Sequence, residues 1–201
     1  LKQTLATLSD MSNTINELLK AASIEDGKFG YNFALGDIME IINEVLTSLV
    51  VRAQEKNIKF VVYPPDFVVP KFVMDKEKIK MAINNIVDNA IKYNVVNGEV
   101  GIKIEQVKNK PFIKISVSDT GIGINEKEFE LIFEKFYRSS TVMKSHTNGI
   151  GLGLYIVKNI IQNHGGQIWL ESIEQRGTTF HFVLPTDPNY IPPQAKSNQT
   201  L

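Results

Sequence analysis

The chain has 201 residues, 43% hydrophobic and 22% charged, a composition typical of one sizeable globular domain or of a smaller domain with an added element. Its 22 basic and 22 acidic residues cancel, so no net field favours nucleic acid or an anionic membrane as partner. The absence of cysteine excludes disulfides, thiolate zinc sites and a cysteine nucleophile, and three scattered histidines argue against a histidine-built metal site.

No apolar run has the length that a membrane-spanning helix needs, and the first residues lack the pattern of a signal peptide. The sequence does not begin with Met, so we expect it to be part of a longer protein. A cytoplasmic setting is the default expectation, either free or as the inner domain of a membrane-anchored protein.

Residues 1–26 show apolar side chains at heptad-like spacing, and Gly27 is placed to end a helix. This stripe predicts one long helix. We expect it to belong to a helical hairpin, bundle or dimer whose partner helix lies upstream. The alternative is a helix that packs in the core of the domain behind it.

From residue 29 the pattern alternates between strands and amphipathic helices. Long helices are predicted at 37–57, 76–93 and 153–164, with a short one at 126–133. Strands are predicted at 29–35, 58–63 and 71–75, and hairpins pair 98–107 with 111–119 and 167–173 with 178–185. Three helices against one mixed sheet form a two-layer α/β sandwich of the α+β class, spanning residues 29–186. Residues 187–201 read as a tail or linker.

The helix at 76–93 carries Asn85, Asn89 and Lys92 at i, i+4 and i+7, which places them on one face. Packing on a sheet needs apolar residues and does not need two asparagines one turn apart. Amide oxygens can ligate Mg²⁺, and a lysine one turn further can meet phosphate. The alternative is an ordinary solvated polar face.

Two glycine-rich stretches, SDTGIGI at 118–124 and NGIGLGL at 148–154, flank the predicted short helix and a polar loop at 138–149. The second precedes a helix, where exposed backbone N–H groups can bind an anion. Neither stretch matches a P-loop or a Rossmann fingerprint. The trio Asp119-Thr120-Gly121 is also the local signature of an aspartic protease, but that enzyme needs a second aspartate in a matching motif, and this sequence has none.

The order of these motifs resembles the catalytic ATP-binding domain of sensor histidine kinases. NNIVDNAIKY is similar to the asparagine box, DTGIGI to the first glycine box, FEKFYR to the phenylalanine box and NGIGLGL to the second glycine box. The wider group has the Bergerat fold and includes gyrase, mismatch-repair ATPases and heat-shock chaperone ATPases. The resemblance covers residues 29–186, and residues 1–28 resemble the second helix of the family's dimerisation domain.

The resemblance implies a role for each matching residue. Asp119 would accept a hydrogen bond from the adenine amino group with support from Thr178, while Gly121 and Gly123 let the backbone pass close to the base. Asn89 would ligate Mg²⁺. The remaining matches would contact phosphate or ribose or form the lid over the phosphates, which spans roughly 136–149; they are Lys92, Tyr93, Phe136, Arg138, Lys144, Gly149, Gly151, Gly153 and Leu154.

Asn85 stands where ATP-hydrolysing members of the group carry a glutamate that activates water. An amide cannot take that proton, so the resemblance favours phosphoryl transfer over hydrolysis. The family's phosphoacceptor is a histidine followed by an acidic residue. None of His146, His164 and His181 is followed by an acidic residue. His146 falls in the lid, and the other two are expected to be structural.

The chain is therefore predicted to bind ATP and Mg²⁺ and to transfer the γ-phosphoryl group to a histidine on a dimerisation helix outside this sequence. A response regulator would receive the group from that histidine, and the full-length protein would be a homodimer. A catalytically silent scaffold with the same fold and a serine kinase sharing these motifs are the alternatives.

Overall fold

The computed structural model describes residues 2–139 and 149–193, the side chains of residues 2–10 and 13 excepted. Helix α1 spans Lys2–Glu25, α2 Ile38–Gln54, α3 Lys76–Lys92 and α5 Gly153–Asn163. The strands are β1 Ala34–Gly36, β2 Lys59–Tyr63, β3 Phe72–Met74, β4 Glu99–Gln106, β5 Phe112–Asp119, β6 Gln167–Ile173 and β7 Gly177–Pro185.

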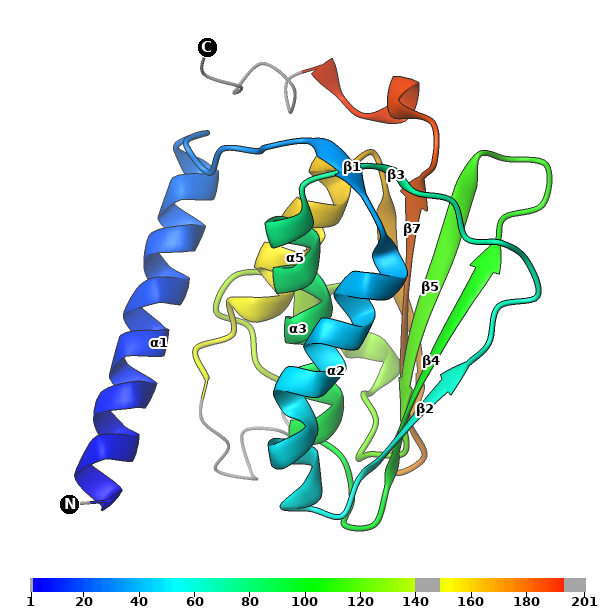
Figure 1. Cartoon of the computed structure of the whole chain (residues 1–201). Coiled ribbons are helices and arrows are strands. Elements are labelled where there is room, and N and C mark those ends of the chain that lie inside the picture. Colours follow the sequence, from blue (N-terminus) through cyan, green and yellow to red (C-terminus); the bar gives the residue numbers. More distant parts are fainter. Residues whose placement is uncertain (1, 140–148, 194–201) are drawn as a thin grey trace.

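One five-stranded mixed sheet forms the second layer of the domain. Its strand order is β2-β4-β5-β7-β6, in which only the β2–β4 pair is parallel. Helices α2, α3 and α5 cover one face of this sheet (Figure 1). The predicted two-layer sandwich and both predicted hairpins, β4–β5 and β6–β7, are confirmed.

Helix α3 shows how the sequence produces this packing. Asp75 caps its first turn, because the carboxylate Oδ1 accepts a hydrogen bond of 3.0 Å from the backbone N–H of Lys78. Apart from the partly buried Met81, the apolar side chains of the helix lie on one stripe and are buried in the core: Ile79, Ala82, Ile83, Ile86, Val87, Ala90 and Ile91. This burial leaves the polar residues of α3 on the opposite side of the helix.

Two predicted elements differ in the structure. The predicted strand at 29–35 is reduced to β1, which pairs with β3 in a small separate sheet. Its aromatic residues turn inward instead, where Tyr31 and Phe33 pack against His164, and the backbone N–H of Asn32 donates to Asp75 Oδ2 at 2.7 Å. The predicted helix at 126–133 is two 3-10 turns, η1 Glu126–Glu128 and η2 Leu131–Phe133.

Helix α1 stands beside the domain and packs along α5 (Figure 1). Ala21 is buried in this contact. The apolar side chains of Met11, Ile15, Leu18 and Leu19 remain between 42% and 60% exposed. Part of the stripe that the sequence shows on this helix is therefore uncovered in the described chain.

The chain continues past β7 into a 3-10 turn, η3 Pro188–Tyr190, where Phe112 meets Tyr190 edge to face and Ile191 is buried. The rest of the expected tail, residues 194–201, lies outside the described residues. In the part of the chain that the structure describes, no helix is both long enough and apolar enough to cross a membrane.

Candidate functional site

A pocket of about 490 Å³ opens between α3, the loop after β5, the segment leading into α5, and helix α1. Most of the residues predicted for the site line it. They are Asn85, Asn89, Lys92, Tyr93, Asp119, Gly123, Arg138, Gly149, Gly151, Gly153, Leu154 and Thr178. Residues more than ninety positions apart in the chain are thus brought to one cavity, as the order of the motifs predicted.

Asp119, the last residue of β5, lines the pocket. Its Oδ1 accepts hydrogen bonds from the backbone N–H of Gly121 at 2.8 Å and of Thr178 at 3.2 Å. Burial raises the pKa of the Asp119 carboxyl to about 6, and these two hydrogen bonds oppose that rise. At neutral pH the group is a fixed, partly desolvated carboxylate that faces an open cavity.

The glycines of the DTGIGI loop lie against the protein's own backbone. A side chain at Gly121 would place its Cβ 2.3 Å from the carbonyl oxygen of Tyr93, and one at Gly123 would place it 2.2 Å from that of Ile173. Gly123 also has a positive φ of 69°. The loop is therefore wedged between the end of α3 and the β6–β7 hairpin, and only glycine fits there. Gly121 does not reach the pocket wall.

The polar face of α3 supplies another part of the pocket wall. Asn85, Asn89 and Lys92 all line it, which confirms that the three share one face. The amide nitrogen of Asn85 donates to the carbonyl of Met81 at 3.0 Å. Its Oδ1 lies so close to α5 that a Cβ on Gly153 would approach it to 2.9 Å. Asn85 is thus held between α3 and the first turn of α5.

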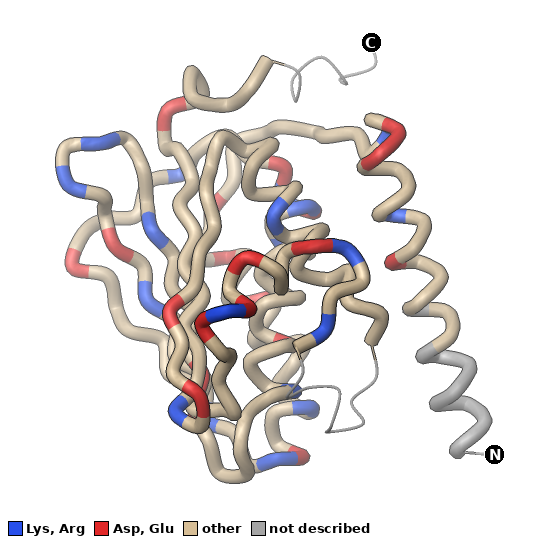
Figure 2. Tube along the Cα trace, turned by 180° about the vertical axis from the view of Figure 1, so that it is seen from behind, with Lys and Arg blue, Asp and Glu red and all other residues tan. Residues whose placement is uncertain are grey.

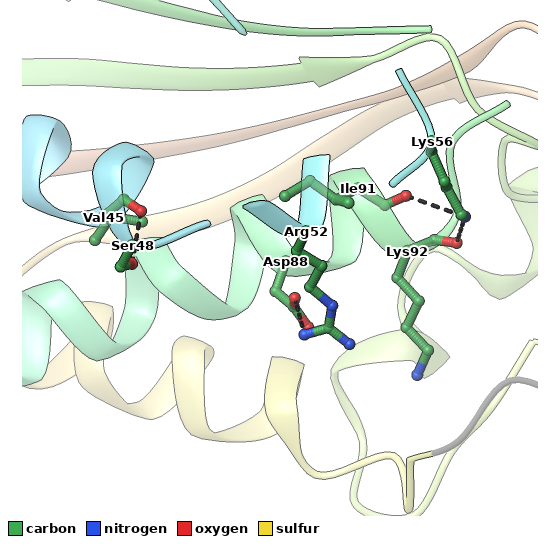
Figure 3. Close-up of polar contacts among 7 residues, drawn as sticks. All are labelled: Val45, Ser48, Arg52, Lys56, Asp88, Ile91 and Lys92. Atoms are coloured by element: carbon green, nitrogen blue, oxygen red, sulfur yellow. Dashed lines mark hydrogen bonds and ion pairs between the residues drawn. The ribbon is translucent and has the colours of Figure 1, made fainter. Parts of the chain in front are cut away.

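Arg52 of α2 and Lys56, two residues past the end of that helix, also hold α3 (Figure 3). The Lys56 ammonium donates to the carbonyls of Ile91 at 3.3 Å and Lys92 at 2.6 Å, and thereby caps the C-terminus of α3. Four residues before Lys56 in the chain, the Arg52 guanidinium pairs with the Asp88 carboxylate, one turn before Lys92 on α3. Burial lowers the pKa of Lys56, helped by the nearby charge of Arg52.

Beyond η2 the chain turns toward the pocket through Phe136. The backbone N–H of Phe136 donates to the carbonyl of Gly151 at 3.0 Å, which ties this segment to the entrance of α5. Phe136 has a positive φ of 62°, its side chain is 62% exposed, and it does not line the pocket, whereas Arg138 does. Lys144 and His146 lie outside the described residues.

Several pocket residues were not predicted from the sequence. The most distant in the chain come from α1, which contributes Thr14, Asn16, Glu17 and Lys20 to the wall. Their polar character and helical spacing were visible in the sequence, but nothing there showed that α1 docks over this pocket. Arg52 and Asp88 also line it; their i to i+36 pairing depends on the packing of α2 on α3.

The other two histidines that the structure describes are packed into the fold. His164 is almost fully buried; its Nε2 accepts a hydrogen bond from the backbone N–H of Asp75 at 3.0 Å, and its Nδ1 lies 2.7 Å from the carbonyl of Ile160. His181 stacks on Trp169 on the opposite face of the sheet from the helices, and its Nδ1 lies 2.8 Å from the Ser116 hydroxyl. Neither lines the pocket.

Basic and acidic residues are interspersed along the described chain (Figure 2), in agreement with the net charge of zero. No group of three or more His, Cys, Asp or Glu side chains that could hold a metal ion occurs among the described residues. A cation in this pocket would therefore take at least part of its ligands from amide oxygens and from the oxygens of a bound ligand.

The known proteins most similar in sequence include the sensor histidine kinase WalK of Bacillus subtilis, which is 34% identical over 176 residues covering 87% of this chain and 28% of WalK. The adaptive-response sensory kinase SasA of a Synechococcus species is 34% identical over 179 residues, 89% of this chain and 46% of SasA. The chain thus spans less than half the length of these relatives.

Among solved structures, the catalytic domain of the histidine kinase ThkA superposes with a TM-score of 0.68 at 32% identity, over 79% of this chain and 99% of that domain. ThkA in complex with the response regulator protein TrrA gives 0.73 at 27% identity, over 92% of this chain and 50% of that one. Residues 74–188 match the family described as histidine kinase-, DNA gyrase B-, and HSP90-like ATPase. The aspartic-protease alternative is thereby ruled out, and the chain belongs to this ATPase family.

Proposed function

We propose that this chain is the ATP-binding kinase core of a two-component sensor histidine kinase. The observation that carries the proposal is one pocket lined by two chemically different groups. One is a fixed carboxylate, Asp119, and the other is the amides and the ammonium group of Asn85, Asn89 and Lys92 along α3. This arrangement suits a ligand with an amino-bearing base at one end and phosphates at the other.

In this proposal the exocyclic amino group of adenine donates to Asp119. Guanine carries a carbonyl at the corresponding position, and two acceptors facing each other would repel, so the site selects adenine. Lys92 meets the phosphates as a cation, and Arg138 adds a second positive charge from the segment before the lid. Tyr93 and the glycines from 149 to 153 border the sugar and phosphates.

The residues present also fit Mg²⁺. The Asn89 amide oxygen is a hard donor within the pocket, and Mg²⁺ characteristically keeps several waters and nucleotide phosphates as its other ligands. When bound, the ion would neutralise charge on the phosphates. The described part of the site offers no carboxylate cluster that could bind the ion without nucleotide.

Asn85 bears on the type of reaction. Its amide is held by Met81 and lies against Gly153, and it has no basic atom that could take a proton from water. The proposed reaction is accordingly transfer: a histidine nitrogen attacks the γ-phosphorus of ATP, the bond from that phosphorus to the bridging oxygen breaks, and ADP leaves. Positioning and charge neutralisation supply most of the rate in such a step.

The acceptor histidine would lie on a dimerisation helix outside this sequence, in a homodimer, and would pass the phosphoryl group to a response regulator in the cytoplasm. Helix α1 would be the second helix of that dimerisation domain, residues 1–28, and its uncovered apolar stripe supports this assignment. The complex of ThkA with TrrA is a precedent for such a partner.

The test is nucleotide binding followed by transfer. The protein should bind ATP in a Mg²⁺-dependent manner, measured by titration calorimetry, and Asn89→Ala should abolish the Mg²⁺ dependence. With γ-labelled ATP and a separately supplied dimerisation domain, label should appear on that domain. A protein that fails to bind ATP at millimolar concentration would instead be a scaffold with this fold.

A further inference from the structure

The side chains of Asn94 and Thr120 meet at the point where the asparagine helix and the adenine loop come together. Asn94 follows α3 by two residues, and Thr120 is the residue after Asp119. The Thr120 hydroxyl donates a hydrogen bond of 2.9 Å to Asn94 Oδ1. The two residues are 26 positions apart, so this bond joins two separate segments of the site.

Both side chains are held in one orientation by further bonds. Asn94 is buried; its Nδ2 donates to the carbonyl of Glu99 at 3.0 Å, and its Oδ1 also accepts from the backbone N–H of Val95 at 3.0 Å. The Thr120 hydroxyl oxygen accepts from the backbone N–H of Glu99 at 2.9 Å. The pattern of donors and acceptors therefore fixes which way the amide points and leaves the hydroxyl proton directed at Asn94.

Gly98 leaves the space in which this contact forms. A Cβ at Gly98 would lie 2.2 Å from Asn94 Oδ1 and 2.8 Å from Thr120 Oγ1. Any side chain there would push the two groups apart. The contact is consequently a packed arrangement of three residues, which we call the latch: Asn94, Gly98 and Thr120.

The latch joins the two segments that carry the proposed ATP site, the end of α3 and the loop after β5. On the side of α3, Lys56 holds the carbonyls of Ile91 and Lys92 and so fixes the end of the helix that carries Asn89 (Figure 3). On the loop side, the backbone N–H of Ile122 donates to the carbonyl of Tyr93 at 3.1 Å. The latch adds a side-chain bond to this backbone contact.

We propose that Asn94 and Thr120 are positioning residues that fix the adenine-binding Asp119 relative to Asn89 and Lys92, so that both ends of ATP are bound at once. The inference rests on the proposed function, because it assigns Asp119 to adenine and α3 to the phosphates. Neither latch side chain lines the pocket, so they act through the residues beside them. A ligand that spans both ends gains from this preorganisation, and a ligand that touches only one end does not.

The test compares ATP with adenosine. Thr120→Val keeps the shape of the side chain and removes the hydroxyl. It should weaken Mg²⁺–ATP binding about 5- to 30-fold, the scale of the one or two hydrogen bonds lost, because the hydroxyl donates to Asn94 and accepts from the Glu99 N–H. Adenosine affinity should change less than twofold, because Asp119 keeps its own bonds to Gly121 and Thr178. Thr120→Ser, which retains the hydroxyl, should restore the wild-type ratio of the two affinities.

Two further variants separate positioning from folding. Thr47→Val removes a hydroxyl that bonds to the Asn43 carbonyl on exposed α2, away from the pocket, and should leave both affinities unchanged. Gly98→Ala keeps every hydrogen-bonding group of the latch and disrupts it sterically, so it should reduce ATP affinity selectively as Thr120→Val does. It also supplies the test if Thr120→Val does not fold.

The outcomes distinguish the two proposals. If the wild-type protein does not bind ATP, the proposed function fails and the latch inference fails with it. If the wild-type protein binds ATP, but Thr120→Val and Gly98→Ala leave the ratio of ATP to adenosine affinity unchanged, only the latch inference is overturned. Equal losses for both ligands would also overturn it, because they would indicate a purely structural role.

Discussion

The backbone N–H of Thr178 donates a hydrogen bond to Asp119 Oδ1 at 3.2 Å, across 59 residues of chain. It joins the start of β7 to the end of β5, so the β6–β7 hairpin holds the carboxylate in place. The second bond to the same oxygen, from Gly121, closes the loop locally. A carboxylate fixed in this way is an acceptor of defined direction, as recognition of an amino group requires.

Asp119→Asn should weaken ATP binding about 10- to 100-fold, the range for a hydrogen bond to a charged group. The amide oxygen can still accept from Gly121 and Thr178, but the amide NH₂ then faces the adenine amino group, donor against donor. The variant should fold as well as the wild type, because it removes a buried charge. Calorimetric titration with ATP gives the affinity and thermal unfolding gives the control; unaltered binding would refute the adenine assignment.

Nucleotide affinity should fall in acid because burial raises the pKa of Asp119 to about 6. Adenine binds the ionised form of this carboxyl group. In the free protein that form becomes protonated as the pH drops through 6. At pH 5 the affinity should be about tenfold lower than at pH 7.5, and binding in this range should release a proton. Adenosine is the ligand to titrate, because it lacks phosphates that change charge. Asp119→Asn should show no such dependence near pH 6.

The sequence predicted most of the architecture because local periodicity decides it. The apolar stripe of α3 is buried as its 3.6-residue spacing requires, and the β4–β5 and β6–β7 hairpins follow from alternation broken by turn residues. The strand predicted at 29–35 is mostly wrong for a non-local reason. Its alternating aromatic residues mimic a strand, yet they pack on His164, which lies about 130 residues later in the chain.

The site, like the fold, was predictable from the sequence only where the signal is local. Motif spacing assigned Asp119 and the α3 asparagines to one site, and the structure has them lining the same pocket. The contribution of α1 could not be seen, because a heptad stripe defines a packing face and does not identify what the helix docks against. The first-glycine-box residues were assigned to close ligand approach, whereas the backbone contacts of Gly121 and Gly123 give them a structural reason as well.

Glu17→Gln should tighten ATP binding about two- to fivefold, the scale of a partly exposed charge pair. Glu17 comes from α1 and lines the same pocket as Lys92. Burial raises its pKa, the charges of Lys20 and Lys92 lower it, and Asp88 raises it again. At neutral pH its ionised form adds negative charge where the phosphates are proposed to bind, and removing that charge favours a polyanion.

The gain from Glu17→Gln should be absent for adenosine and should shrink at high salt, where exposed charges are screened. Glu55→Gln makes the same change of charge at an exposed residue of α2 that does not line the pocket, so it is the matched control. Equal ATP affinities of Glu17→Gln and the wild type across ionic strengths would show that α1 exerts no electrostatic effect on the site.

His164 should make folding less favourable as the pH drops from 6.5 toward 4. Its pKa is lowered to about 4, mainly by burial, against 6.5 in an unfolded chain. Between these values the unfolded state binds more protons than the folded state, so stability present above pH 6.5 is lost on acidification. The loss should be about 2 kcal/mol by pH 5 and about 3 kcal/mol in full.

Asp119 has the opposite effect on folding stability over the same pH range. Its folded pKa of about 6 lies above its ordinary value of 3.8, so the folded state binds the extra proton and gains about 1 kcal/mol on going from pH 7.5 to pH 5. These two groups together should therefore lower wild-type stability by only about 1 kcal/mol over this interval, the difference between the two effects. The Asp119→Asn variant, which lacks the compensating group, should lose more stability, and urea unfolding at the two pH values measures the difference.

NMR titration of the His164 imidazole distinguishes its contribution to the pH dependence of stability from those of other groups. Its Nε2 accepts the Asp75 N–H, so protonation at that atom would break a buried hydrogen bond, and its imidazole signal in NMR should not titrate until the pH nears 4. Burial also lowers the pKa of His181, with the same sign, so His181→Gln in the Asp119→Asn background is the control. A His164 signal that titrates near 6.5 in the folded protein would contradict this account, because the packing and hydrogen bonds around His164 could not then disfavour the charged ring.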